Sequence, residues 1–147
     1  MKPRRCLHWF GMLAGWCALA VSLGTGCGRL QVKGTVERTL QIDGMGGDNI
    51  KSLSYTPTSW QQSVKVLVRT DGPPVDVYLV LERDQAALET QLGNQQAVTV
   101  QTLAKAEKVT EKEIEATVPA GNGFAVVLVN NGTKNASVAV KIATEKK

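Results

Sequence analysis

The sequence predicts an all-β protein, an antiparallel β-sandwich of jelly-roll or immunoglobulin type with one short helix. Three observations favour this class. Apolar residues recur at every second position in several short segments, as at Val64, Val66 and Val68, which is typical of a strand with one buried face. Clusters of glycine, proline and asparagine separate these segments. About 115 residues follow the N-terminal apolar region, enough to bury a sizeable core without disulfides.

Four strands are expected in the first part of this region. Segment 34–42 alternates, and a glycine-rich turn over 43–49 separates it from a second strand over 50–55. Segment 63–69 carries alternating valines, and a further alternating strand over 75–81 follows the prolines of 70–74, which cannot continue a central strand. We expect the strands over 63–69 and 75–81 to supply the centre of the core.

One helix is predicted near 84–92. Asp84 can cap its first turn, Leu88 and Leu92 are spaced i,i+4, and Gly93 suits its end. Strands over 97–103 and 113–118 are then expected on either side of a charged tip, for which a helix over 104–114 is the alternative. The charges of this tip are Lys105, Glu107, Lys108, Glu111 and Lys112.

The C-terminal part predicts a β-hairpin. Residues 124–129 are nearly all apolar, which is typical of a strand buried on both faces. Asn130-Asn131-Gly132-Thr133 contains the Asn-Gly pair that favours a tight turn with positive φ. Alternation returns at Ala136 and runs to Ile142, and residues 144–147 are expected to form a charged tail.

The first thirty residues have the layout of an export signal. Three basic residues precede an apolar run over 7–23, and small residues follow it. Three interpretations are open: cleavage after Ala20 or Gly26, an uncleaved membrane anchor at the lower limit of spanning length, and a lipoprotein signal. Leu23-Gly24-Thr25-Gly26-Cys27 resembles the lipobox of bacterial lipoproteins, with Gly24 where a large aliphatic residue is usual.

We favour the lipoprotein interpretation, because Cys27 would be the sole cysteine of the mature chain. The resemblance implies cleavage before Cys27 and lipid on its sulfur. The expected organisation is a signal peptide over 1–26, the lipidated cysteine with a short tether over 27–31, a β-sandwich domain over 32–143 and the tail. The protein would then be exported and anchored through Cys27 to a membrane of the bacterial cell envelope.

The order of strand motifs also resembles a known family. Val75-Asp76-Val77-Tyr78-Leu79 and Val118-Pro119-Ala120-Gly121-Asn122-Gly123-Phe124 are similar to segments of the bacterial pre-peptidase C-terminal domain, and GOLD-like domains share this rhythm. The similarity covers roughly residues 32–143, and the charged segment 104–115 departs from it. This resemblance implies an extracytoplasmic β-sandwich with a binding or accessory role and without catalytic residues.

Composition argues against several functions. The net charge of +4 falls close to zero without Lys2, Arg4 and Arg5, and basic and acidic residues are mixed along the remaining chain. We therefore expect no nucleic-acid partner. All three cysteines and the single histidine lie within the first 27 residues. The later part consequently has no Cys or His nucleophile, base or metal ligand, and we expect no cofactor.

Few residues are candidates for a site. The oxygen ligands of Asp43, Asp48 and Asn49 make a weak calcium candidate, because their spacing differs from that of an EF-hand loop. Tyr55 and Trp60 could present aromatic faces to a sugar, although a sandwich core needs most of its aromatic residues.

An enzyme is the least favoured function. Asp71, Asp76, Glu82 and Asp84 cluster in sequence around one strand and could act as a hydrolytic pair at about 5–9 Å separation. A solvated outer strand face explains them more simply. We expect a non-catalytic interaction or structural module with an envelope protein or glycan as partner. The alternative is a carbohydrate- or peptidoglycan-binding module that uses Tyr55 and Trp60.

Overall fold

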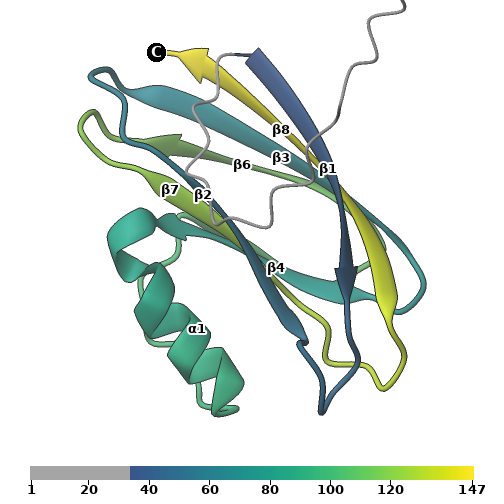
Figure 1. Ribbon diagram of the computed structural model, residues 1–147. Helices are drawn as coiled ribbons and strands as arrows, with labels where there is room; N and C mark the ends of the chain where they lie inside the picture. The colour runs from purple at the N-terminus through teal and green to yellow at the C-terminus, as the bar shows by residue number, and fades with distance from the viewer. Residues whose placement is uncertain (1–33) are drawn as a thin grey trace, which may run out of the picture.

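Two four-stranded antiparallel sheets pack face to face in the computed structural model, which describes residues 34–147 (Figure 1). The predicted all-β sandwich with one short helix is confirmed. No helix of the described part has the length and hydropathy needed to span a bilayer. The predicted signal peptide, Cys27 and its tether lie outside the described residues.

Each sheet draws its strands from both halves of the chain. The first sheet has the order β1-β8-β3-β6, and the second has the order β2-β7-β4-β5. The first consists of β1 (Gly34–Ile42), β8 (Ala136–Lys146), β3 (Gln62–Asp71) and β6 (Glu111–Val118). The second consists of β2 (Ile50–Tyr55), β7 (Phe124–Val129), β4 (Val75–Leu81) and β5 (Ala104–Val109).

Consecutive strands lie in different sheets, with β4 and β5 as the exception within residues 34–147. The predicted hairpin of β7 and β8 is therefore wrong. Both sides of β7 are already paired, with β2 and β4, and both sides of β8 are paired, with β1 and β3. The Asn-Gly segment instead carries the chain from one sheet to the other, and neither Asn131 nor Gly132 has positive φ.

The main core lies between the two sheets. The inward side chains of β3 and β4 are buried there, including Val64, Val66, Val77 and Leu79, as expected for the two central strands. Because side chains alternate along a strand, the intervening residues of the first sheet face solvent.

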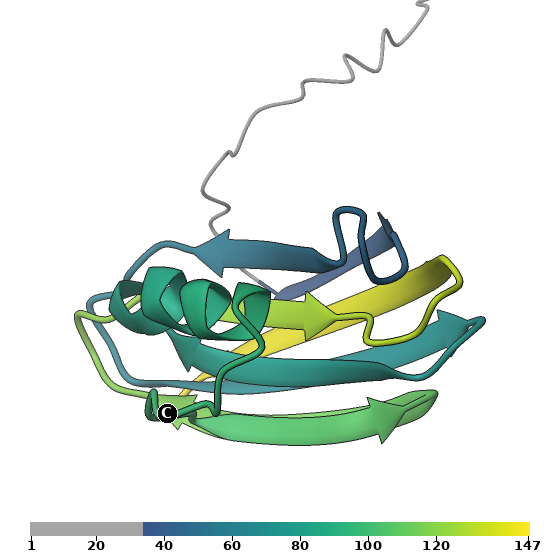
Figure 2. The same ribbon diagram turned by 90° about the horizontal axis from the view of Figure 1, so that it is seen from below.

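A second apolar cluster lies on the outer face of the second sheet, where the helix packs against the strands (Figure 2). A 3₁₀ turn (η1, Glu82–Asp84) leads into helix α1 (Gln85–Gly93), whose Leu88 is fully buried against this face. Both faces of the second sheet are thus covered, and all six residues of β7 are buried, as its continuous apolar sequence predicted. The predicted cap is wrong: Asp84 is already helical and its side chain makes no cap hydrogen bond.

Two expectations about residues 97–118 are wrong. Segment 97–103 is not a strand, because Val98 and Val100 pack onto the face of the second sheet. The charged segment 104–114 is neither a tip nor a helix: it contains β5, a turn at Thr110 and the start of β6. Its charges suit strands at the edges of the two sheets, where they discourage association with other edges.

The loops gather at two ends of the sandwich. Residues 43–49, 72–74, 110 and 130–135 form what we term the loop end. Gly34, residues 56–61 and the C-terminus form the opposite, terminal end, where β8 continues to Lys146 in register with Gln62. β8 therefore includes most of the segment expected as a charged tail.

Candidate functional site

The structure does not bring the two candidate aromatic residues to one surface. Tyr55 is 1% exposed and its ring stacks on Phe124 inside the core, with ring centroids 4.7 Å apart. It therefore cannot offer a face to a ligand. Trp60 is 36% exposed in the loop that precedes β3, with the Lys146 ammonium 5.7 Å from its ring centroid.

The predicted carboxylates lie in three elements: Asp71 ends β3, Asp76 lies in β4, and Glu82 and Asp84 belong to η1. Asp76 lies near one end of β4 and Glu82 follows the other end, so about 20 Å of extended chain separates them. That separation exceeds the 5–9 Å of a two-carboxylate hydrolase. Both oxygens of Asp76 are engaged, accepting bonds of 2.6 Å from the Lys108 amide and from Asn131 Nδ2.

The weak calcium candidates serve the loop itself. One oxygen of the Asp43 carboxylate accepts a hydrogen bond from the Asp48 amide, the Asp48 carboxylate pairs with Lys51, and Asn49 Nδ2 donates to the Asn130 carbonyl. Within residues 34–147 no group of three or more His, Cys, Asp or Glu side chains could hold a metal ion.

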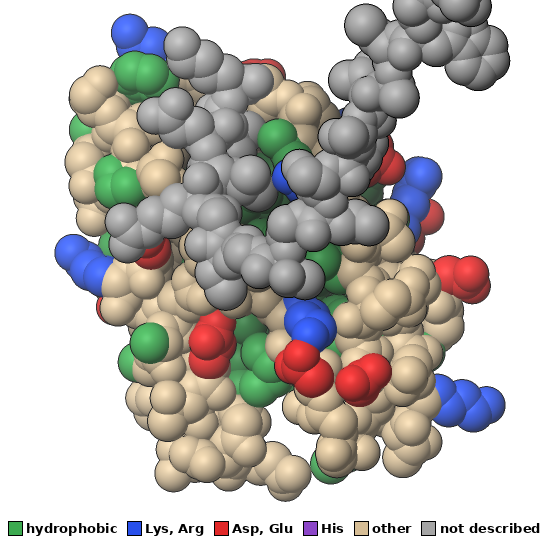
Figure 3. All heavy atoms as spheres, viewed as in Figure 1, with side chains coloured by type: hydrophobic (Ala, Val, Ile, Leu, Met, Phe, Trp, Pro, Cys, Tyr) green, Lys and Arg blue, Asp and Glu red, His purple; other side chains and the backbone are tan. Residues whose placement is uncertain are grey.

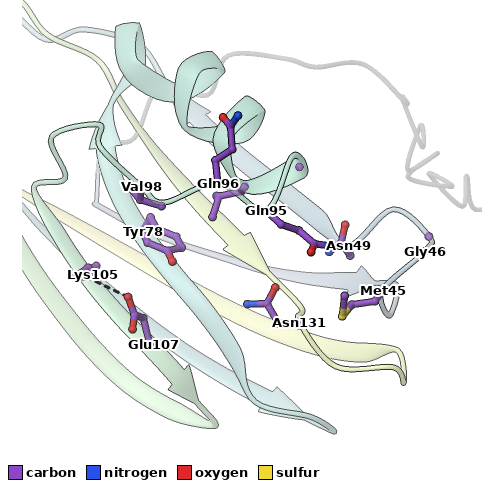
Figure 4. A pocket seen from close by; sticks show the side chains of 13 residues that line it. Met45, Gly46, Asn49, Tyr78, Gln95, Gln96, Val98, Lys105, Glu107 and Asn131 are labelled. Carbon is purple, nitrogen blue, oxygen red and sulfur yellow. Dashed lines mark hydrogen bonds and ion pairs between the residues drawn. The ribbon is translucent and has the colours of Figure 1, made fainter.

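The structure reveals a pocket of about 700 Å³ toward the loop end, on the outer face of the second sheet (Figure 4). Met45 and Gly46 of the loop 43–49 lie at one side, and Lys105 and Glu107 of β5 lie at the other. The end of α1 and the segment that follows it form the upper wall. The remaining lining residues include Asn49, Tyr78, Gln95, Gln96, Val98 and Asn131.

Asn130 fixes the two loops on the Met45 side. Its side chain is fully buried, donates to the carbonyls of Ile42 and Lys134, and accepts from the Gly132 amide. Its backbone amide donates to the Asn49 carbonyl at 2.9 Å. A buried amide with this many partners holds the β1–β2 loop and the β7–β8 connection in one arrangement.

Close backbone packing adds to this arrangement. The Met45 amide donates to the Gly132 carbonyl at 2.8 Å. A Cβ at Gly44 would lie 2.5 Å from the Thr133 carbonyl carbon, so glycine is required at that position. The glycine-rich sequence of this loop therefore reflects a close approach of two backbones.

The helix side of the pocket is held by a single glutamine. Gln91 Nε2 donates to Thr99 Oγ1 at 2.7 Å, and its Oε1 accepts from the Thr99 amide at 3.0 Å. This pair of bonds ties the segment after α1 back to the helix. Gln95 and Gln96 consequently stand at the pocket rim on a restrained segment.

The chemistry of the lining is mainly neutral and hydrogen-bonding. Asparagine and glutamine amides provide donors and acceptors. Tyr78, a residue that is 4% exposed, contributes the edge of its ring. The charges of Lys105 and Glu107 compensate one another in an ion pair of 3.1 Å. Burial, and then the carboxylates of Asp76 and Glu107, raise the pKa of Tyr78 above its ordinary value. Tyr78 therefore stays protonated and neutral at physiological pH.

The surface charges are mixed. Figure 3 shows Lys and Arg side chains interspersed with Asp and Glu on one face, and neither sign forms a continuous patch on the visible part of residues 34–147. This visible face therefore carries no basic stripe of the kind that tracks a phosphate backbone.

Sequence patterns did not predict this pocket. Its residues come from the β1–β2 loop, β4, the end of α1 with the segment that follows it, β5 and the β7–β8 connection, which are far apart in the chain. The only hint was the turn chemistry of residues 43–49 and 130–133, which suggested exposed loops.

Comparison with known proteins concerns the fold. No protein-family model and no curated protein sequence matches the chain. Among solved structures, a periplasmic inhibitor of g-type lysozyme from Aeromonas hydrophila, PliG, superposes with a TM-score of 0.51 at 7% identity, covering 80% of this chain and 94% of that one. The pre-peptidase C-terminal domain of a collagenase from Bacillus anthracis superposes with a TM-score of 0.49 at 13% identity, covering 80% and 92%. The likeness to PliG shows a shared β-sandwich arrangement.

Proposed function

We propose that the chain is a lipid-anchored, non-catalytic binding module of the bacterial cell envelope, which recognises a polar partner through the loop-end pocket. The observation that carries this proposal is the lining of the pocket. Neutral amide groups and one protonated tyrosine surround it, while Asp76 and Glu82, at opposite ends of β4, are too far apart for paired acid–base chemistry. Such a lining suits recognition by hydrogen bonds.

The direction of the chain supports display of this pocket away from a membrane. β1 begins at the terminal end and its nine residues run to the loop end, a distance of about 30 Å. A lipid on Cys27 would tether the terminal end, because only six residues separate Cys27 from Gly34. The pocket would then face outward from the anchoring bilayer.

A glycan is the specific ligand class that the side chains favour. Planar amides can donate to and accept from paired hydroxyl groups of a sugar. Within residues 34–147 no hydrogen bond engages the side-chain amides of Gln95 and Gln96, so these groups are available. The second candidate ligand is a protein loop that is rich in backbone amides. Because PliG is named as an inhibitor of g-type lysozyme, a g-type lysozyme is the protein to test.

Nuclear magnetic resonance titration tests the pocket. The probes are soluble muropeptides and, separately, a g-type lysozyme, each added to isotopically labelled chain. We expect shifts of the side-chain amides of Gln95, Gln96 and Asn131, and loss of these shifts in a Gln95→Ala, Gln96→Ala variant. A matched Gln41→Ala variant, which changes an exposed glutamine on β1, should bind as the wild type does. Shifts confined to residues outside the pocket would refute the proposed site.

Intact mass of the chain recovered from membranes tests the anchor. A species that begins at Cys27 and carries diacylglyceryl and acyl groups is expected, and Cys27→Ala should abolish it. An unmodified mature chain would overturn the anchor and leave the pocket proposal to be judged by its own titration.

A further inference from the structure

The terminal end of the sandwich carries an exposed tryptophan beside two lysines. Trp60 is the one large aromatic side chain of the described residues that is exposed. Lys146 Nζ lies 5.7 Å from the centroid of its ring, within the range of a cation–π contact. Lys147 follows at once, and its backbone amide donates to the Gln61 carbonyl at 2.9 Å. The two ends of this cluster are therefore joined, although 84 residues separate Gln61 from Lys146 in sequence.

The loop that carries Trp60 is held in place. Thr58 Oγ1 donates to the Trp60 carbonyl at 2.7 Å, and the Thr58 carbonyl accepts from the Gly121 amide at 2.7 Å. Lys147 Nζ also donates to Thr117 Oγ1 at 2.9 Å. The tryptophan is thus presented by a restrained loop, which lowers the entropic cost of binding through it.

The position of this cluster relative to the start of the chain is informative. Gly34 pairs with Thr144, two residues before Lys146. The six residues between Cys27 and Gly34 can span at most about 20 Å. If Cys27 carries lipid, the Trp60 cluster is on the side of the domain that lies next to the bilayer.

We propose that Trp60, Lys146 and Lys147 form a contact with the surface of an anionic bilayer, which orients the anchored domain. Tryptophan favours the membrane interface because its ring is apolar while its N–H bonds to water or headgroups. Each lysine near an anionic leaflet adds an attraction that weakens with salt. This inference rests on the proposed lipid anchor, and it adds an orientation that the anchor alone does not impose.

Tryptophan fluorescence provides the test. Trp9 and Trp16 precede Cys27, so Trp60 is the sole tryptophan of a chain that begins at Cys27. The full chain is expressed with its signal, purified from membranes, checked by intact mass and reconstituted into phosphatidylethanolamine–phosphatidylglycerol vesicles, with or without bromine on the acyl chains. We expect brominated lipid to cause about a twofold loss of Trp60 emission, as for an interfacial ring.

Matched variants separate this contact from chance proximity. Replacing both terminal lysines, Lys146→Gln with Lys147→Gln, should reduce the quenching by about half or more, and raised salt should act in the same direction. Lys134→Gln, at the loop end, removes one exposed lysine far from the cluster and should leave the quenching unchanged.

The outcomes distinguish this proposal from the anchor. A lipidated chain that floats with the vesicles but shows equal Trp60 emission with and without bromine overturns the contact and leaves the anchor intact. Equal effects of the terminal pair and of Lys134→Gln also overturn it. A chain that lacks lipid and stays in solution overturns the anchor, and the contact with it.

Discussion

Replacement of Asn130 by leucine tests whether one buried side chain organises the loop end. Leucine has a similar volume and cannot bond to the three backbone groups that Asn130 satisfies, namely the carbonyls of Ile42 and Lys134 and the amide of Gly132. A buried polar group that loses its partner costs about 1–3 kcal/mol. The Ile42 bond is long at 3.4 Å, and the other two groups are only partly buried. We therefore take about 1 kcal/mol for each and expect a loss of about 3 kcal/mol in unfolding free energy.

Urea denaturation followed by circular dichroism in the β-sheet band measures this loss. Asn131→Leu is the matched control, because Asn131 is exposed and its side chain donates one hydrogen bond, of 2.6 Å, to Asp76. We expect the control to lose less than about 1 kcal/mol. A loss below about 1 kcal/mol for Asn130→Leu would refute the reasoning, because the loops would then be held by their backbone contacts alone.

Three further substitutions follow from the packing. Burial raises the pKa of Tyr55, and burial, followed by the carboxylates of Asp76 and Glu107, raises the pKa of Tyr78. The folded protein therefore holds these two protons more tightly than the unfolded chain. The contribution of the two tyrosines to the unfolding free energy should be constant below their ordinary pKa of 10.0 and fall as pH rises beyond it. Tyr55→Phe should remove part of this loss of stability at alkaline pH. At neutral pH it should change the unfolding free energy by less than about 1 kcal/mol, because the Tyr55 hydroxyl is buried without a hydrogen-bond partner. An unchanged dependence of the unfolding free energy on alkaline pH would contradict this. Gly44→Ala should cost about 1–3 kcal/mol through overlap with the β7–β8 backbone, whereas Gly93→Ala meets only a side-chain carbon at 4.0 Å and should be tolerated in thermal melts. Leu88→Ala should cost about 2–5 kcal/mol by opening a cavity between α1 and the second sheet, and a stability close to wild type in urea would contradict the burial of that helix.

Strands could be predicted from the sequence because an apolar residue at every second position indicates that one face of the strand is buried. Val64, Val66 and Val68 all face the core, and residues 124–129 are buried on both faces as their apolar run predicted. β5 was missed because its inward positions are held by small alanines at 104 and 106, while lysine and glutamate occupy the outward positions. Periodicity in hydrophobicity is weak in such an edge strand.

Strand pairing could not be recognised, because it depends on partners far away in the chain. The Asn-Gly sequence after β7 favours a hairpin locally, yet both edges of β7 and β8 are occupied by other strands. The pocket could not be predicted for the same reason, because its walls come from five segments that are separate in sequence. Tyr55 illustrates the limit for single residues: its stacking on Phe124 follows from the pairing of β2 with β7.

The distribution of strands between the sheets sets when the chain can fold during synthesis. β1 pairs with β8, β2 with β7, and β3 with β6 and β8, so none of the first four strands hydrogen-bonds to another of them. A growing chain that has reached Leu81 therefore has no sheet to form, and even the first available pairing, of β4 with β5, must await residue 104. Pairing over such long separations is slow. The four N-terminal strands therefore depend for their sheet partners on residues 104–146, and their inward valines have no sheet to cover them until that part of the chain has been made.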